Sequence, residues 1–167
     1  ETENGKNKTI LRITVALFAL SLVHSLKTTA VFIAVIAKRI GYPFELEWLE
    51  GIGLDHAVRS VAGLPFYTQP SVDFISLVYT PVYFLLSFIP FHLGAEPGFW
   101  FGRLLSVLCA IGTAFVVFWV VGKETKNTAW ALFSALWIPV SYKACGAWFD
   151  LVKADTMQVM LVMIAAL

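Results

Sequence analysis

Charged residues and cysteines are both scarce in this sequence. Asp, Glu, Lys and Arg make up only 14% of its 167 residues, and the formal net charge is +1. A chain with so few basic residues has no stripe of positive charge to neutralise phosphates, which argues against a nucleic-acid partner. The two cysteines, Cys109 and Cys145, both lie in apolar runs, where a free thiol behaves as a small hydrophobe, so no disulfide framework is indicated.

Apolar residues dominate the composition instead. They make up 59% of the chain, and the mean hydropathy is +0.78. This composition is too apolar for a water-soluble domain with a polar surface, so we predict an integral membrane protein of the all-α class. The chain begins without methionine and ends inside an apolar run, so we expect residues 1–167 to be a single transmembrane domain and a fragment of a longer polytopic protein.

Four apolar stretches are predicted to be membrane-spanning helices. They cover residues 9–37, 99–121, 128–149 and 155–167, the last of them truncated. The short link between the second and third stretches carries Lys123 and Lys126, which marks the cytoplasmic side under the positive-inside rule. The N-terminus then lies inside, and residues 38–98 form an outer loop. We expect the plasma (inner) membrane, with the active face directed outward.

The outer loop is predicted to hold two short helices. Apolar residues recur at helical spacing from Leu54, and Gly63 would end this amphipathic helix, which we expect to lie flat at the membrane surface. The second helix begins at Thr80 and should stop at Pro90 after about nine residues. Such a helix reaches about 14 Å, too little to cross the hydrocarbon core, so we predict a re-entrant or interfacial helix.

Two carboxylates, Glu47 and Glu50, precede the amphipathic helix. They lie three positions apart, so on a helical turn both point to one side. Like charges near a low-dielectric boundary repel, and they persist if one is protonated, a cation lies near or a metal is bound. The spacing of the two carboxylates therefore indicates a chemically functional site. The alternative is that both are solvated loop acids that interact with the dipole of the following helix.

A second polar cluster, "WFDLVKADT", lies where the third predicted span meets the outer surface. Asp150 and Lys153 are i, i+3 neighbours and could pair with each other. Asp155 begins the next apolar stretch. It is either a partner for the dipole of that helix or a further carboxylate directed at the Glu47 and Glu50 turn.

Four segments in order, "ELEWLEGIGLDHAVRSVAGLPFY", "YTPVYFLL", "FGRLLSVL" and "WFDLVKADTMQVMLVMIAAL", resemble the N-terminal membrane half of GT-C superfamily glycosyltransferases of the protein mannosyltransferase and aminoarabinose transferase type. The resemblance covers residues 42–167. Those enzymes take a sugar from a polyprenyl-phosphate donor on the outer face of the membrane. The resemblance therefore implies transfer of a sugar from such a donor to a glycan, protein or lipid acceptor.

The same resemblance implies roles for the acidic residues. Glu50 resembles the catalytic carboxylate and Glu47 its acidic companion, while Lys153 and Asp155 resemble a later basic-x-Asp element, which makes Asp155 a third catalytic candidate. Many relatives have two adjacent acidic residues, whereas two residues separate the glutamates here. It therefore stays open which of the two carboxylates is catalytic. One would act as general base on the acceptor hydroxyl while lipid phosphate departs. A divalent metal ion held by Glu47 and Asp155 would stabilise the leaving phosphate.

The donor phosphate and the sugar need partners as well. The segment before Pro81 lacks the lysine that some relatives place there, so a phosphate-binding cation must come from elsewhere in the chain. The candidates are Arg59, Arg103 and Lys153. The candidates for stacking on the sugar or the prenyl chain are Trp48, Tyr67 and Tyr83, although aromatics at a membrane interface need no such role.

Two other functions stay open at this point. A non-catalytic, transferase-like scaffold subunit of a larger membrane assembly would have its carboxylates paired off or covered by partner subunits. A transporter or channel would line a polar path with ionisable groups at mid-membrane. The candidates for that path are Lys27, Asp150, Lys153 and Asp155.

Overall fold

The structure is a computed structural model that describes residues 3–65, 67–72, 74–76 and 79–167. Within these ranges the regular structure is helical, apart from one isolated bridge between Ser71 and Phe74. The helices are α1 (Glu3–Arg39), α2 (Trp48–Val61), α3 (Val82–His92), α4 (Trp100–Thr125), α5 (Thr128–Ser141) and α6 (Asp155–Ala165). The predicted all-α class is therefore confirmed.

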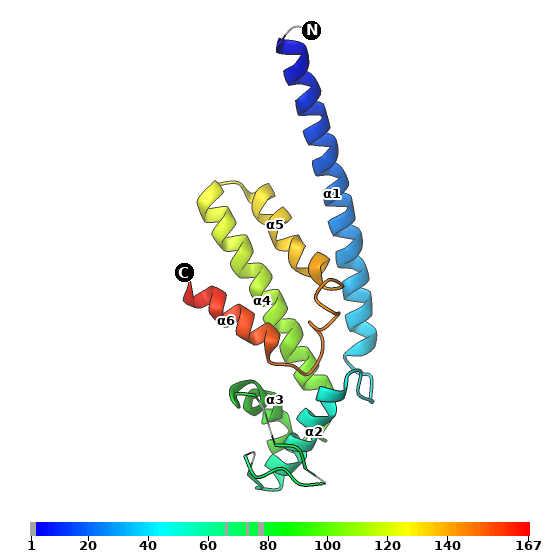
Figure 1. Cartoon of the computed structure of the whole chain (residues 1–167), viewed down its shortest axis with the longest axis vertical. Helices are drawn as coiled ribbons and strands as arrows, with labels where there is room; N and C mark the ends of the chain where they lie inside the picture. The colour runs from blue at the N-terminus through cyan, green and yellow to red at the C-terminus, as the bar shows by residue number, and fades with distance from the viewer. Residues whose placement is uncertain (1–2, 66, 73, 77–78) are drawn as a thin grey trace.

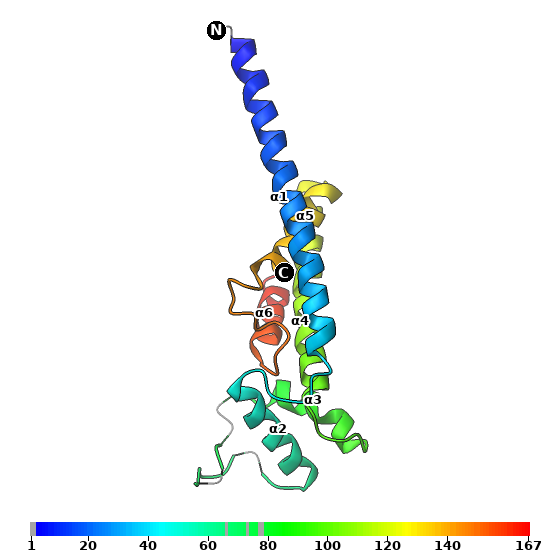
Figure 2. The same cartoon turned by 90° about the vertical axis from the view of Figure 1, so that its right-hand side faces the viewer.

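Helix α4 is the central element of the fold. Helices α3, α5 and α6 all pack on it, α1 packs on α5, and α2 packs on α3 (Figure 1). Two views at right angles place α2 and α3 together, beside the N-terminal end of α4 and beyond the C-terminal end of α1 (Figures 1 and 2). The residues of the predicted outer loop therefore gather at one end of the molecule.

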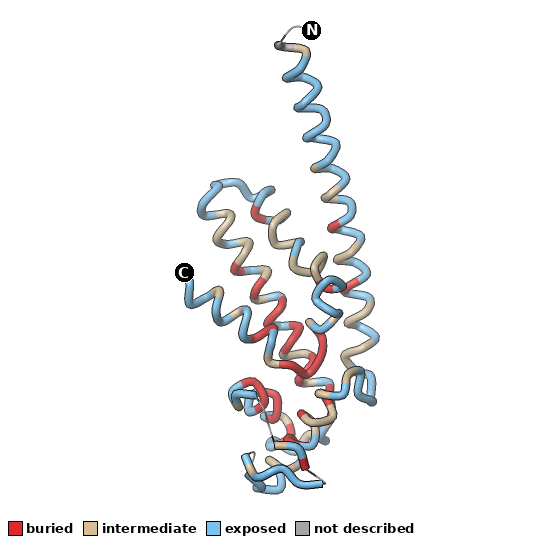
Figure 3. The backbone as a smooth tube through the Cα atoms, in the orientation of Figure 1, coloured by how far each residue is buried: buried red, intermediate tan, exposed pale blue. Residues whose placement is uncertain are grey.

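Helix α1 presents apolar side chains to its surroundings. It has 37 residues and is about 55 Å long at 1.5 Å per residue. Only 6% of the residues in its most apolar 18-residue stretch are buried, and most of its N-terminal half is exposed (Figure 3). In the described part of the chain, two helices, Gly5–Arg39 and Trp100–Thr125, are long and apolar enough to cross a membrane. A long apolar helix without protein cover is unusual for a surface in water.

The link between α4 and α5 is as short as the sequence indicated. Helix α4 ends at Thr125, and its C-cap Lys126 has a left-handed φ of 53° that stops the helix. Asn127 then caps α5, because its side chain accepts hydrogen bonds from the backbone N–H groups of Ala129 and Trp130. The result is a tight helical hairpin with Lys123 and Lys126 at its tip.

The predicted span 128–149 is wrong in its second half. Helix α5 ends at Ser141 after 14 residues, about 21 Å. Pro139 lies in its last turn, where it cannot donate the hydrogen bond that would continue the helix. Positive φ angles at Gly146 and Ala147 then turn the chain, and residues 142–154 form an irregular link to α6. Helix α6 begins at Asp155, as predicted.

The two short helices of the 38–98 segment are present with shifted ends. Helix α2 begins at Trp48, so it includes Glu50, and Gly63 follows it with a left-handed φ of 72°. Helix α3 continues two residues past Pro90, because one proline near a helix end removes only one late hydrogen bond. Their predicted existence and order are confirmed, while the predicted stop at Pro90 is wrong.

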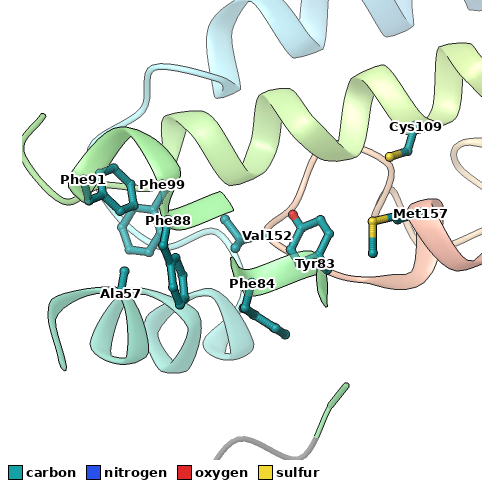
Figure 4. Close-up of a cluster of buried hydrophobic side chains, with 9 residues drawn as sticks. All are labelled: Ala57, Tyr83, Phe84, Phe88, Phe91, Phe99, Cys109, Val152 and Met157. Atoms are coloured by element: carbon teal, nitrogen blue, oxygen red, sulfur yellow. The ribbon is translucent and has the colours of Figure 1, made fainter. Parts of the chain in front are cut away.

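Nine buried side chains join the short helices to the long one. They come from α2, α3, α4, the 142–154 link and α6, and they are Ala57, Tyr83, Phe84, Phe88, Phe91, Phe99, Cys109, Val152 and Met157 (Figure 4). Burial is concentrated at this junction (Figure 3). The core therefore holds the start of α2 and the end of the link in fixed positions next to α4.

Gly102 permits the close approach of the link to α4. A Cβ atom at this position would lie 2.8 Å from Cγ1 of Val152. We expect Gly102→Ala to lower the free energy of unfolding by about 1–3 kcal/mol, as overpacked cores do. Gly122→Ala in the same helix is the control, because its Cβ would meet Ala131 at an ordinary 3.5 Å. Thermal unfolding in detergent measures both variants, and equal melting temperatures would contradict this packing argument.

Candidate functional site

A fully buried ion pair joins α2 to α4. Arg103 donates from Nε to Oε1 of Glu50 at 2.9 Å and from Nη2 to Oε2 at 2.8 Å. Both side chains are completely buried. This bidentate geometry is the strong form of the arginine–carboxylate interaction. It connects two residues that are 53 positions apart in the chain.

Arg103 has no N–H group to spare. Its Nη1 donates to the backbone oxygens of Arg39 (2.8 Å) and Tyr42 (2.6 Å), and its Nη2 donates to that of Phe44 (2.8 Å). A guanidinium carries five N–H donors, and with the two to Glu50 all five are used. Arg103 therefore fastens the end of α1 to α4, and it has no donor available for a phosphate.

Glu50 is saturated in the same way. Its Oε2 also accepts from the backbone N–H of Leu46 (2.7 Å), and its Oε1 accepts from that of Val152 (3.0 Å). Burial raises the pKa of Glu50, but the hydrogen bonds from Arg103, Leu46 and Val152 outweigh it, so the pKa lies below the usual range and the carboxylate is ionised. All of its roughly four acceptor positions are occupied, which leaves none for an acceptor hydroxyl.

Glu47 differs from Glu50 in having a free oxygen. It is the N-cap of α2, and its Oε2 accepts from the backbone N–H of Leu49 at 3.1 Å. The same oxygen lies 3.3 Å from Nζ of Lys153. Its Oε1 has no hydrogen-bond partner among the described residues, and the side chain is 17% exposed. Of the two glutamates, only Glu47 can accept a further proton donor.

Lys153 holds its charge between a carboxylate and an aromatic ring. Its Nζ lies 3.6 Å from the ring centroid of Trp148. This contact is additional to the ion pair that Lys153 forms with Glu47. The lysine side chain is 6% exposed. An ammonium over an indole face is attracted by the ring quadrupole. Sequence reasoning missed Trp148, because no spacing rule relates a loop tryptophan to a lysine five positions later.

Asp150 belongs to a second buried cluster. Its Oδ2 lies 3.2 Å from Nε of Arg39, and Tyr142 donates its hydroxyl hydrogen to Oδ1 at 2.8 Å. Arg39 also donates to the Tyr142 hydroxyl oxygen. Burial is the largest effect on the pKa of Asp150 and raises it above the usual range. The local pairing of Asp150 with Lys153 that the spacing suggested is therefore not present, and both residues pair with distant partners.

The other two charged candidates, Arg59 and Asp155, make no ion pair with Glu47 or Lys153 among the described residues. Arg59 lies in the last turn of α2, about 16 Å along the helix from its first residue, and its guanidinium stacks 3.9 Å over the ring of Phe74. Asp155 is exposed at the start of α6 and lines a cavity together with Trp148. Arg59 therefore cannot share one phosphate with Lys153.

The three predicted stacking residues have different environments. Tyr83 is completely buried, and its hydroxyl donates to the backbone oxygen of Gly102 at 2.8 Å, so it is a core residue. Trp48 and Tyr67 are 66% and 57% exposed. Exposure leaves these two available for a ligand, but it is equally expected of aromatics at a membrane interface.

A metal site at Glu47 and Asp155 was one of the predictions. In the part of the chain that the structure describes, no group of three or more His, Cys, Asp or Glu side chains is placed to hold a metal ion. The nearest charged partner of Glu47 is the ammonium of Lys153, which repels a cation. These residues do not fit a metal, and we derive no chemical step through one.

Comparison of the chain with protein-family models, with curated proteins and with solved structures found no match in any of the three. The functional argument therefore rests on the residues of this chain and on their geometry.

Proposed function

We propose that the chain is part of an integral membrane glycosyltransferase that transfers a sugar from a polyprenyl-phosphate donor to a glycan, protein or lipid acceptor. The observation that carries this proposal is the Glu47–Lys153 pair. It combines a carboxylate with a free oxygen and an ammonium group at 3.3 Å. The fully satisfied Glu50–Arg103 pair beside it keeps both segments in place. General base and phosphate partner are the two groups that this transfer needs.

The proposed location is the plasma (inner) membrane, with the site on its outer face. Helices α1 and α4 would cross the bilayer, since their length and composition allow it. The basic hairpin tip with Lys123 and Lys126 lies toward the same end of the molecule as the N-terminus (Figure 1), as the positive-inside rule expects of a cytoplasmic side. Helices α2 and α3 at the opposite end would then be interfacial.

The proposed chemistry uses one proton transfer and one substitution. Oε1 of Glu47 takes the proton of the acceptor hydroxyl, whose oxygen forms a bond to the anomeric carbon of the sugar. The bond between that carbon and the phosphate oxygen breaks, and the electron pair leaves with the polyprenyl phosphate. Lys153 keeps N–H donors beyond its contact with Glu47, and these would stabilise the departing phosphate.

An apolar groove supports a lipid-linked donor. A cavity of about 770 Å³ lies between α1, α4 and α5. Its lining is almost entirely hydrocarbon and includes Leu26, Ile33, Ile111 and Leu136. A groove of this composition fits a prenyl chain, because burying apolar surface is favourable and non-directional.

Replacement of Lys153 tests the proposal directly. We expect Lys153→Met to slow transfer from polyprenyl-phosphate sugars about 10²–10³-fold, the usual cost of removing one charge-stabilising donor. Met keeps the length of the side chain and its contact with Trp148, so the melting temperature should change little. Lys143→Met is the matched control, because Lys143 is an exposed lysine of the same link. Equal transfer rates in the two variants would contradict the role of Lys153.

A second candidate function follows from the pairing of the buried charged side chains with other groups of the protein. Glu50 and Arg103 are buried and fully hydrogen-bonded to each other and to backbone groups, and the buried Asp150 is paired with Arg39, as expected for a transferase-like scaffold subunit of a larger membrane assembly. The scaffold requires no free carboxylate oxygen, whereas the enzyme does. A wild-type protein that transfers no sugar across a broad panel of polyprenyl-phosphate donors would favour the scaffold.

A further inference from the structure

A second cavity, of about 340 Å³, lies between α4, the C-terminal end of α5, the 142–154 link and the start of α6. Its volume is at the lower end of the range of about 300–1,000 Å³ for small-molecule sites. Most of its lining is apolar, with Trp148 and Phe149 contributed by the link. The polar side chains that converge on it are Thr113, Ser141, Asp155 and Thr156.

Two of these polar groups lack a protein partner. Thr156 is 7% exposed, and its buried hydroxyl oxygen has no hydrogen-bond partner among the described residues. A buried hydroxyl without a partner destabilises the fold, so a ligand that forms a hydrogen bond with it would remove this penalty. The carboxylate of Asp155 forms no ion pair with the described part of the chain, and it is exposed at the cavity.

The other two polar groups, the hydroxyls of Thr113 and Ser141, can only accept hydrogen bonds from a ligand. Thr113 donates its hydroxyl hydrogen to the backbone oxygen of Cys109 (3.0 Å), and Ser141 donates to that of Ile138 (2.7 Å). Together with the carboxylate of Asp155, they add acceptor oxygens to a lining that also contains the indole of Trp148. A ligand that suits this lining has several hydroxyl donors on its edge and a C–H face for the aromatic ring. A sugar ring has both.

We propose that this cavity is the subsite for the sugar ring of the donor, with Trp148, Asp155 and Thr156 as its recognition residues. This inference rests on the proposed glycosyltransferase function. We assign the cavity to the sugar of the donor rather than of the acceptor, because Trp148 both lines the cavity and lies 3.6 Å from Nζ of Lys153. A ring bound there has its phosphate next to the ammonium, as a glycosyl phosphate requires.

Cys145 provides a native reporter for the site. It lines the cavity and its thiol is exposed, whereas the other cysteine, Cys109, is buried in the core. The experiment measures the rate at which N-ethylmaleimide alkylates Cys145 of the detergent-solubilised wild type, with peptide mapping to separate the two cysteines. The probes are a panel of polyprenyl-phosphate sugars, polyprenyl phosphate without sugar, and free methyl glycosides. Sugar transfer is assayed in the same samples.

A sugar-bearing donor is expected to slow the alkylation about tenfold at about ten times its dissociation constant, because only unoccupied protein reacts. Polyprenyl phosphate and methyl glycosides at the same concentration should leave the rate unchanged. Thr156→Val should weaken the donor's affinity about two- to tenfold, as loss of one hydrogen bond does. The melting temperature of Thr156→Val should not fall, because the removed hydroxyl has no hydrogen-bond partner among the described residues. A purely structural threonine would show the opposite pattern.

The outcomes separate this inference from the proposed function. Protection by bare polyprenyl phosphate would mean that the cavity holds lipid rather than sugar, and protection by methyl glycosides alone would mean an acceptor sugar; both overturn the inference. Transfer without protection of Cys145 overturns it as well and leaves the glycosyltransferase intact. Protection of Cys145 by the sugar-bearing donors without any sugar transfer supports the sugar subsite and rules out the proposed glycosyltransferase activity.

Discussion

Glu50→Gln is expected to prevent stable folding rather than to impair chemistry alone. The carboxylate accepts from Arg103 twice and from the backbone N–H groups of Leu46 and Val152. An amide has one oxygen and one NH₂ group, so two of these four donors would face another donor. Breaking a buried ion pair from one side costs about 3–5 kcal/mol, which is a large part of the stability of a domain of this size, about 5–15 kcal/mol.

The measurement is the yield of monodisperse protein in detergent and its melting temperature. Glu45→Gln is the matched control, because Glu45 is exposed two positions before Glu47 and should tolerate the change. Arg103→Met should resemble Glu50→Gln, since it removes the same pair and also frees the backbone oxygens of Arg39, Tyr42 and Phe44. A Glu50→Gln protein that melts like wild type but transfers no sugar would restore Glu50 as the catalytic carboxylate.

Glu47→Gln is expected to have the opposite signature. The glutamine oxygen can still accept from the backbone N–H of Leu49 and so keep the cap of α2. It cannot take a proton from an acceptor hydroxyl, and loss of a general base lowers the rate about 10²–10⁴-fold. The melting temperature should fall less than in Glu50→Gln, because the amide oxygen can still accept from the Lys153 ammonium and the Glu47 side chain is 17% exposed rather than fully buried.

The measurement is transfer from polyprenyl-phosphate sugars by detergent-solubilised variants matched for the amount of folded protein. Glu47→Asp is the conservative variant and should retain part of the activity, since it keeps a carboxylate. The exposed Glu45→Gln again serves as the control. Full transfer by Glu47→Gln would remove this residue from the mechanism and would require a different general base.

Features that depend on neighbouring residues were predictable from the sequence. The two long apolar helices, the short basic link between α4 and α5, the start of α6 at Asp155 and the stop after α2 at Gly63 all follow from local hydropathy and from backbone preferences. The end of α5 was missed although Pro139 was visible, because hydropathy continues to residue 149 and a late proline does not always stop a helix. Helix α3, which extends past Pro90, shows that exception.

The roles of the charged residues were decided by the tertiary structure. The sequence by itself determined that Glu47, Glu50, Arg103 and Lys153 are costly charges in an apolar chain, but not how they pair. Val152 donates to Glu50 from 102 positions away, and Lys153 faces Glu47 rather than its neighbour Asp150. Local spacing ranks only partners on the same helix, whereas the pairing of buried charges depends on which segments the core brings together. The packing of α3 and α6 on α4, and of α2 on α3, therefore made Glu50 a structural residue and left Glu47 with an oxygen that has no hydrogen-bond partner among the described residues.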